Sequence, residues 1–180
     1  MDLEKTFLEI IERKHRELNL GQDYMYKFSK VKDFEGNAIG QIGEEYFKAI
    51  VSRITQIIDD GVIHNEYDIL TVSGIYFEVK TARKGRSNNT FQFNGINPSY
   101  NYHYLICLGV CEEKLLYRIF KKNEIEYKHR DRKHYIVQGD FQRQLVQMNP
   151  NNLVNLKLTL NITDLFDIQN LIRDLQEMLN

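Results

Sequence analysis

Two carboxylates and an ammonium group stand close together in the middle of the sequence. Asp68 is followed, after nine intervening residues, by Glu78-Val79-Lys80. Two acidic side chains that converge can hold a hard divalent cation through their oxygen atoms. A lysine beside them can orient or help to deprotonate an attacking water, and can stabilise the charge that builds on a phosphate. These residue types in this order point to hydrolysis of a phosphodiester.

Glu44 is a third acidic candidate, because it lies on a predicted helix that precedes the two strands. At about 100° per residue, Glu44 falls at the border of the apolar side of this helix, whereas Glu45 falls nearly opposite that side. We therefore assign Glu44 to the site and Glu45 to solvent. Gly40 and Gly43 are unfavourable inside a helix. Close contact between helix and sheet would explain them, and local flexibility is the alternative.

The elements that must position these residues follow from the spacing of apolar side chains. Helical spacing predicts a helix over 3–18, a second helix from Asn37 as its N-cap to about Asp60, and a connecting loop over 19–36. A final amphipathic helix is predicted over 163–179, capped by Thr163, to pack on the core or to serve a dimer. Strands are predicted over 67–72, 75–81, 90–94, 104–110, 115–120, 134–137 and 153–160. This order predicts a single α/β domain over 1–180, with a mixed central β-sheet flanked by helices.

The turn between the first two strands decides whether the carboxylates can meet. A two-residue turn would place Asp68 opposite Val79, so that Asp68 and Glu78 would point to opposite sides of the sheet. A three-residue loop over 72–74 places Asp68 opposite Glu78 and puts Gly74 in the left-handed conformation that such loops favour. A shared site therefore requires the three-residue loop or a bulge near Asp68.

Asp68 and Glu78-Val79-Lys80, preceded by a helix that bears Glu44, resemble the motif of the PD-(D/E)xK nuclease superfamily. The likeness covers about residues 37–120 and is greatest to small Type II restriction endonucleases, although Tyr67 stands where the name-giving proline would stand. The resemblance implies a restriction-endonuclease-like fold and a Mg²⁺ cofactor, for which Mn²⁺ can substitute. It also implies that the metal is held at Asp68, Glu78 and Val79, with Lys80 and Glu44 completing the catalytic set.

A restriction enzyme of this kind would act on double-stranded DNA and leave 5′-phosphate and 3′-hydroxyl ends. It would be a homodimer, because one active site cuts one strand and a two-fold pair of sites matches a palindrome. A homing, repair or junction-resolving nuclease of the same fold is the second hypothesis. A catalytically silent DNA-binding or interaction module is the third, in which the carboxylates and Lys80 form an ordinary surface cluster.

The net charge at first argues against a nucleic-acid partner. The formal charge is −1, whereas nucleic-acid binders are commonly basic. From Lys80 to Arg143, however, thirteen Lys and Arg face six Asp and Glu, a balance of +7, while the remaining residues carry −8. A basic middle segment suits a polyanion, and a solvated surface is the alternative.

Polar and basic side chains of this segment are candidates for contacts with DNA. Gln and Asn can make bidentate contacts with adenine, and Lys and Arg neutralise phosphates. A solvated loop or an exposed polar strand face would have the same composition. The candidates are Arg83, Lys84, Arg86, Asn88, Gln92, Asn94, Lys128, Arg130, Arg132 and Lys133.

Two further expectations concern the setting of the protein. The sequence has no apolar run of the ~18–20 residues that a membrane span needs and no apolar leader at its N-terminus. We therefore expect a cytoplasmic protein with no membrane partner. Cys107 and Cys111 lie in and after an apolar strand, which predicts buried thiols in place of a disulfide or a metal pair.

Overall fold

The structure is a computed structural model that describes residues 2–18, 20, 26–86, 88–149 and 151–179. Its α-helices are α1 (Leu3–Glu17), α2 (Gly36–Val51) and α3 (Leu171–Leu179). Short 3-10 helices are η1 (Ser29–Asp33), η2 (Lys122–Glu124), η3 (Ile162–Asp164) and η4 (Ile168–Asn170). No helix of this described part is long and apolar enough to cross a membrane.

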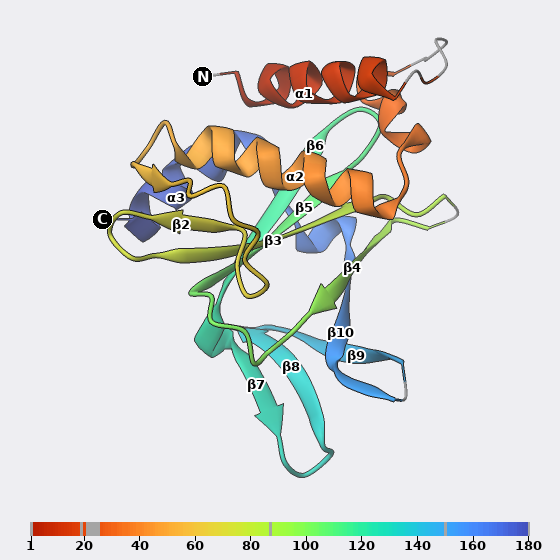
Figure 1. The fold of residues 1–180 in the computed structure, drawn as a ribbon. Helices are drawn as coiled ribbons and strands as arrows, with labels where there is room; N and C mark the ends of the chain where they lie inside the picture. The colour runs from red at the N-terminus through yellow and green to blue at the C-terminus, as the bar shows by residue number, and fades with distance from the viewer. Residues whose placement is uncertain (1, 19, 21–25, 87, 150, 180) are drawn as a thin grey trace.

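The strands form two sheets (Figure 1). The first has the order β1-β2-β3-β5-β6-β11, in which β3 and β5 are parallel and the other described pairs are antiparallel. Its strands are β1 (Ile57–Ile58), β2 (Ile69–Thr71), β3 (Tyr76–Arg83), β5 (Tyr104–Val110), β6 (Leu115–Lys121) and β11 (Phe166–Asp167). The second sheet is antiparallel, with the order β4-β10-β9-β8-β7. Its strands are β4 (Thr90–Ile96), β7 (Ile125–Lys128), β8 (Lys133–Gln138), β9 (Phe141–Asn149) and β10 (Asn152–Asn161).

Each face of the first sheet is covered, which gives three layers. Side chains alternate along β5, so that Ile106 and Leu108 join one apolar cluster with the helices, while Leu105 and Cys107 join another with the second sheet. Figure 1 shows α1, α2 and α3 together on one side of the first sheet. The predicted α/β class, and a β5 strand covered on both faces, are confirmed.

The predicted mixed central sheet is present as the first sheet, but helices cover only one of its faces. The other face is covered by a second sheet that was not predicted, in which β4 pairs with β10 from the end of the chain. Arg118 of β6 helps to hold the two sheets together. Its guanidinium donates to Gln138 Oε1 of β8 at 2.8 and 3.0 Å and stacks on the Phe141 ring at 3.7 Å. The prediction of two buried free thiols, Cys107 and Cys111, is confirmed.

The second helix is shorter than predicted. It begins at Gly36, with Glu35 and not Asn37 at the N-cap, and it ends at Val51 instead of near Asp60. The helix ends early because Ile57 and Ile58 form an edge strand that pairs with β2. The predicted loop over 19–36 contains η1, and its residues 19 and 21–25 lie outside the described residues.

The terminal helix begins at Leu171 and not at Thr163. Asp164 is buried, and its carboxylate accepts bonds from the Asn161 amide at 2.8 Å and from Arg143 Nη2 at 2.7 Å. The following residues then pair with β6 as β11. These contacts keep the residues between Thr163 and Leu171 from forming the first turns of the helix that their apolar spacing predicts.

Gly43 brings α2 against β3 beside the site. A Cβ at Gly43 would stand 1.7 Å from Thr81 Oγ1 and 2.9 Å from Thr81 Cβ. Thr81 cannot turn away from this contact, because the position of its Cβ is fixed by the backbone. Close contact therefore explains Gly43, whereas a Cβ at Gly40 would meet nothing within 4 Å.

We expect Gly43→Ala to lower the free energy of unfolding by about 1–2 kcal/mol, because overpacking costs more than the gain in helix propensity of about 1 kcal/mol. Gly40→Ala in the same helix is the matched control and should raise the free energy of unfolding by up to about 1 kcal/mol. Urea denaturation of both variants measures these changes. Equal stabilisation by the two substitutions would contradict the close approach of α2 to β3.

Candidate active site

The β2–β3 hairpin has the register that a shared site requires. Ile69 pairs with Phe77, and the Thr71 amide donates to the Ile75 carbonyl at 3.0 Å. The loop is therefore the three residues 72–74, and Gly74 has a φ of +80°. Continued by one residue, this register brings Asp68 opposite Glu78. The predicted three-residue loop is confirmed.

Asp68 is fixed against β3 by two hydrogen bonds. Its amide donates to the Phe77 carbonyl at 2.8 Å, and its Oδ2 accepts from the Val79 amide at 2.7 Å. The amide and carbonyl of one strand residue point to the same side. The Val79 carbonyl therefore also faces the side on which Asp68 lies.

Glu78 and Lys80 lie two residues apart on β3 and form an ion pair. Only 5% of the Glu78 side chain and 22% of the Lys80 side chain are exposed. Burial, followed by the nearby Asp68 carboxylate, raises the pKa of Glu78, and burial also raises the pKa of Asp68. Burial alone would lower the pKa of Lys80, but Glu78, Asp68 and Glu44 outweigh it, so this pKa is raised and the ammonium is protonated at neutral pH.

Glu44 reaches the same site from α2. Its side chain is half-buried, and this burial, together with the Asp68 carboxylate, raises the pKa of Glu44 to about 7. Glu45 does not simply face solvent as predicted, because its half-exposed carboxylate forms an ion pair with Arg13 of α1. The two neighbouring glutamates therefore serve different contacts.

The donor set suits a hard divalent cation. Three carboxylates share the site with one buried ammonium, so the site carries excess negative charge that is poorly hydrated. Over the described residues, His, Cys, Asp and Glu side chains form no group of three arranged to hold a metal. Mg²⁺ is usually held by one or two carboxylates with water and substrate phosphates. Asp68, Glu78 and the Val79 carbonyl fit that pattern.

Three residues that were not predicted also border the site: Tyr102, Lys122 and Lys48. Tyr102 is 3% exposed, and its hydroxyl has no hydrogen-bond partner among the described residues. Lys122 Nζ lies 4.2 Å from the centre of the Tyr102 ring and donates to the Tyr100 carbonyl at 2.8 Å. Lys48 follows Glu44 by one helical turn, a spacing that could have identified it.

Four of the candidate DNA contacts share the outer face of the second sheet. Along its strands, inward residues such as Phe93 and Ile136 join the core, while Gln92, Asn94, Lys128 and Lys133 have the opposite orientation. The end of β4 approaches the site, because a Cβ at Gly95 would lie 4.0 Å from Lys80 Nζ.

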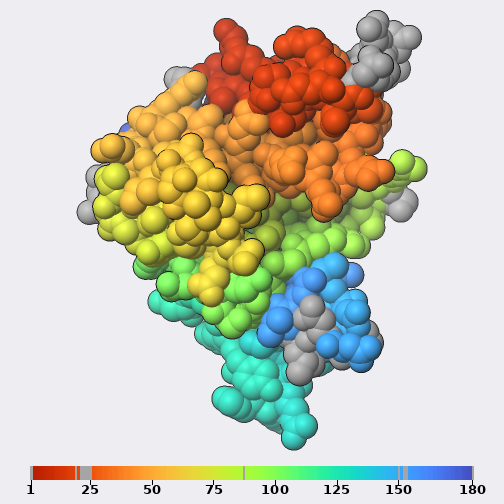
Figure 2. Space-filling view, viewed as in Figure 1, coloured from red at the N-terminus to blue at the C-terminus, as the bar shows by residue number. Residues whose placement is uncertain are grey.

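Two further basic candidates lie in the β7–β8 hairpin. Arg130 and Arg132 are exposed between β7 and β8, the hairpin that forms the lowest projection of the molecule in Figure 2. Lys128 and Lys133 pair directly at the end of its strands, an arrangement of like charges that is unfavourable without an anion. Lys128 Nζ also donates to Gln142 Oε1 at 3.0 Å.

Some candidate DNA contacts in the segment after β3 instead make hydrogen bonds within the protein. Arg83 donates to the Lys32 carbonyl at 2.8 Å and so contacts η1. Asn88 Oδ1 accepts from the Thr90 hydroxyl at 2.7 Å and supports the turn into β4. Lys84 and Arg86 are exposed. Of the four candidates, these two remain the ones available to a ligand.

No family model and no curated protein matches this sequence. Any functional assignment must therefore be argued from the site.

We expect Glu44→Gln to change how stability depends on pH. Between about pH 4.5 and pH 7 the folded protein keeps the Glu44 proton that the unfolded chain has released, so the free energy of unfolding falls as pH rises through this window. The amide of the variant cannot titrate, so the variant should gain stability relative to the parent protein from about pH 5 to about pH 8. Thermal unfolding at both pH values measures this difference.

Glu45→Gln is the matched control, because it removes a carboxylate of the same helix that pairs with Arg13 instead of facing the site. A stability difference between Glu44→Gln and the parent protein that stays constant with pH would show that Glu44 is not held in a desolvated, negatively charged site.

Proposed function

We propose that this protein is a metal-dependent endonuclease that hydrolyses phosphodiester bonds in double-stranded DNA. The observation that supports it most strongly is the convergence of Asp68, Glu78 and Lys80 at the end of one hairpin, with Glu44 reaching the same place from α2. Burying three carboxylates around one ammonium costs stability unless a ligand uses them. A catalytically silent module has no obvious need for this arrangement.

Asp68, Glu78 and the Val79 carbonyl would hold Mg²⁺, with Mn²⁺ able to substitute. When bound, such a cation lowers the pKa of a water molecule and offsets the charge of the phosphate.

The protein's own side chains supply the remaining chemistry. The protonated Lys80 ammonium orients the attacking water and stabilises the negative charge that develops on the phosphate oxygens. Glu44, whose pKa is about 7, is suited to accept a proton near neutral pH. Glu78 positions Lys80 through their ion pair.

The outer face of the second sheet is the proposed DNA-binding surface. It offers amides at Gln92 and Asn94 on β4, the strand whose end approaches Lys80, and ammonium groups at Lys128 and Lys133 toward the opposite edge of the sheet. The β7–β8 hairpin is a two-stranded ribbon, a shape that the major groove of DNA admits. Site-specific cleavage by a Type II restriction enzyme is the form of this function that we favour.

A mixed sheet that carries the site on an antiparallel hairpin, with α2 packed on one face, supports a restriction-endonuclease-like fold. A homodimer follows from cleavage of a palindrome, because one site cuts one strand. A homing, repair or junction-resolving nuclease would use the same residues on a different DNA geometry.

We expect plasmid DNA with Mg²⁺ to give discrete fragments. Asp68→Asn and Glu78→Gln should each lower the cleavage rate at least about 10²–10³-fold, and so should Lys80→Ala at every pH tested. DNA binding should be kept by the carboxylate variants, because removal of a negative charge eases repulsion of phosphates. Gel assays of cleavage and anisotropy of labelled DNA measure the two properties.

Glu113→Gln is the control, because it neutralises an exposed carboxylate in the turn between β5 and β6. A smear in place of bands would indicate a nonspecific nuclease. No cleavage with any divalent metal would favour the silent module, and an unchanged rate in Lys80→Ala would refute the assigned mechanism.

We expect the double variant Lys128→Gln/Lys133→Gln to weaken binding to all DNA sequences. Loss of two phosphate contacts should reduce the slope of log K against log salt concentration by about 1.8. Anisotropy titrations at several salt concentrations measure this slope. Lys5→Gln/Lys114→Gln removes two exposed lysines elsewhere and should leave it unchanged. An unchanged slope in the first variant would exclude this edge of the outer face as a DNA contact.

A further inference from the structure

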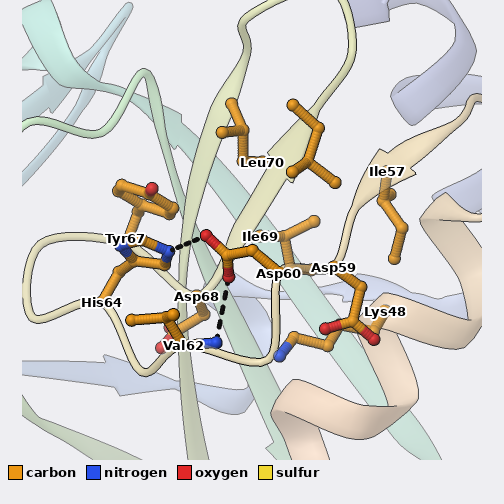
Figure 3. Close-up of a pocket in the computed structure, with 11 residues that line it drawn as sticks. Lys48, Ile57, Asp59, Asp60, Val62, His64, Tyr67, Asp68, Ile69 and Leu70 are labelled. Carbon is orange, nitrogen blue, oxygen red and sulfur yellow. Dashed lines mark hydrogen bonds and ion pairs between the residues drawn. The ribbon is translucent and has the colours of Figure 1, made fainter.

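A pocket that includes Asp68 in its lining lies between α2, β1 and β2 (Figure 3). It is a shallow recess that is open to solvent. Its walls come from the end of α2, from β1 and the loop that follows it, and from β2. The residues that matter to its chemistry are Lys48, Asp60, Val62, His64, Tyr67 and Asp68.

One wall of the pocket is aromatic and apolar. The His64 and Tyr67 rings stack at 4.6 Å with an angle of 17° between their planes. Val62 is 62% exposed and Ile58 is 47% exposed, so apolar surface at the mouth of the pocket stays uncovered. Tyr67 also packs on Tyr76 at 4.6 Å, so a flat aromatic ligand would stack on the His64 ring, which Tyr67 supports.

The opposite wall carries Lys48, a cation whose charge also acts on Glu44 and Asp68. Lys48 Nζ has no hydrogen bond or ion pair with the described residues, and in Figure 3 it reaches toward the side of the pocket where Asp68 lies. A phosphate bound there would be a close neighbour of the candidate catalytic carboxylate.

The remaining charged groups restrict where an anion could sit. Asp60 accepts from the Val62 amide at 3.0 Å and from His64 Nε2 at 2.9 Å (Figure 3). Asp59 Oδ1 accepts from the Gly61 amide at 3.4 Å. The Asp60 carboxylate disfavours phosphate at the aromatic end but can accept hydrogen bonds from amino or hydroxyl groups, whereas Figure 3 draws Asp59 on the Lys48 side of the pocket. A base at the aromatic end would thus meet Asp60 as a hydrogen-bond acceptor, and a phosphate would depend on the Lys48 ammonium to offset the nearby carboxylates.

We propose that this pocket binds one unpaired nucleotide of the DNA, with its base against His64 and Tyr67 and its phosphate at Lys48. The inference rests on the proposed function, because Asp68 belongs both to the pocket and to the hydrolytic site. A nucleotide seated here lies next to the bond that is cut. The preferred substrate is thus a duplex in which one nucleotide at the cleavage point is unpaired or leaves the helical stack.

Binding of two labelled duplexes tests this inference. One is fully paired, and the other differs only in a single unpaired nucleotide, with Ca²⁺ replacing Mg²⁺ so that binding is measured apart from cleavage. We expect anisotropy to show about ten-fold tighter binding of the second duplex, the range given by stacking one base on an aromatic side chain. His64→Ala should abolish this preference, whereas Tyr67→Phe, which keeps the ring, should retain it.

Lys48 is tested through its proposed partner, the phosphate of the unpaired nucleotide. Replacing that phosphate by a neutral methylphosphonate should weaken binding to the parent protein but should not weaken binding to Lys48→Gln any further. Lys5→Gln, an exposed lysine of α1, is the control that should keep the effect of the methylphosphonate. Additive losses in Lys48→Gln would overturn the assignment of the phosphate.

The outcomes separate this inference from the proposed function. Cleavage of DNA without preference for the unpaired nucleotide, or a preference that survives His64→Ala, would refute nucleotide binding in the pocket. Neither result would contradict the proposed nuclease activity. A preference for the unpaired nucleotide without cleavage in Mg²⁺ or Mn²⁺ would support the pocket and refute the nuclease. Failure to bind either duplex would refute both.

Discussion

The register of the β2–β3 hairpin is the constraint on which the rest of the site depends. Gly74, at a φ of +80°, permits a three-residue loop, and this loop sets Ile69 opposite Phe77. A shift by one residue would turn Ile69, now 2% exposed, out of the core. The same shift would place Asp68 opposite Val79 instead of opposite Glu78. Burial of an apolar side chain and convergence of the carboxylates therefore require one and the same register, so core packing stabilises the geometry of the site.

Features that depend on neighbouring residues could be predicted from the sequence, and features that depend on distant pairing could not. The covered strand β5 and the choice of Glu44 follow from local periodicity, whereas the three-residue loop was predicted as a condition of a shared carboxylate site. The second sheet could not be foreseen, because β4 pairs with β10, some sixty residues later. The early end of α2 depends in the same way on pairing of Ile57 with Thr71. Tyr102 carries no local signal, since its burial results from how the chain returns to the first sheet after β4.

The two-sheet arrangement also explains how a chain of net charge −1 can present a surface for a polyanion. The inner face of the second sheet is apolar and packs on the first sheet, so its polar and basic residues must lie on the outer face or in the hairpins. Asp68, Glu78 and Glu44 instead point into a partly desolvated site. Opposite charges are thus separated in space although they nearly cancel in number, and the net charge says little about the local field.

Because the carboxylates are gathered at one site, binding of a cation there affects binding of DNA. Lys80 alone cannot neutralise three carboxylates, and their raised pKa values, which burial causes, show that the charged forms are destabilised. A phosphate approaching this site adds further negative charge, so it is repelled when the carboxylates are ionised and no cation is bound. A cation removes that repulsion, and by linkage a bound phosphate must strengthen the hold on the cation by the same factor. When all three carboxylates are ionised, they and the Lys80 ammonium leave two negative charges, which one divalent cation balances. Binding of a DNA phosphate at this site therefore depends on binding of the cation.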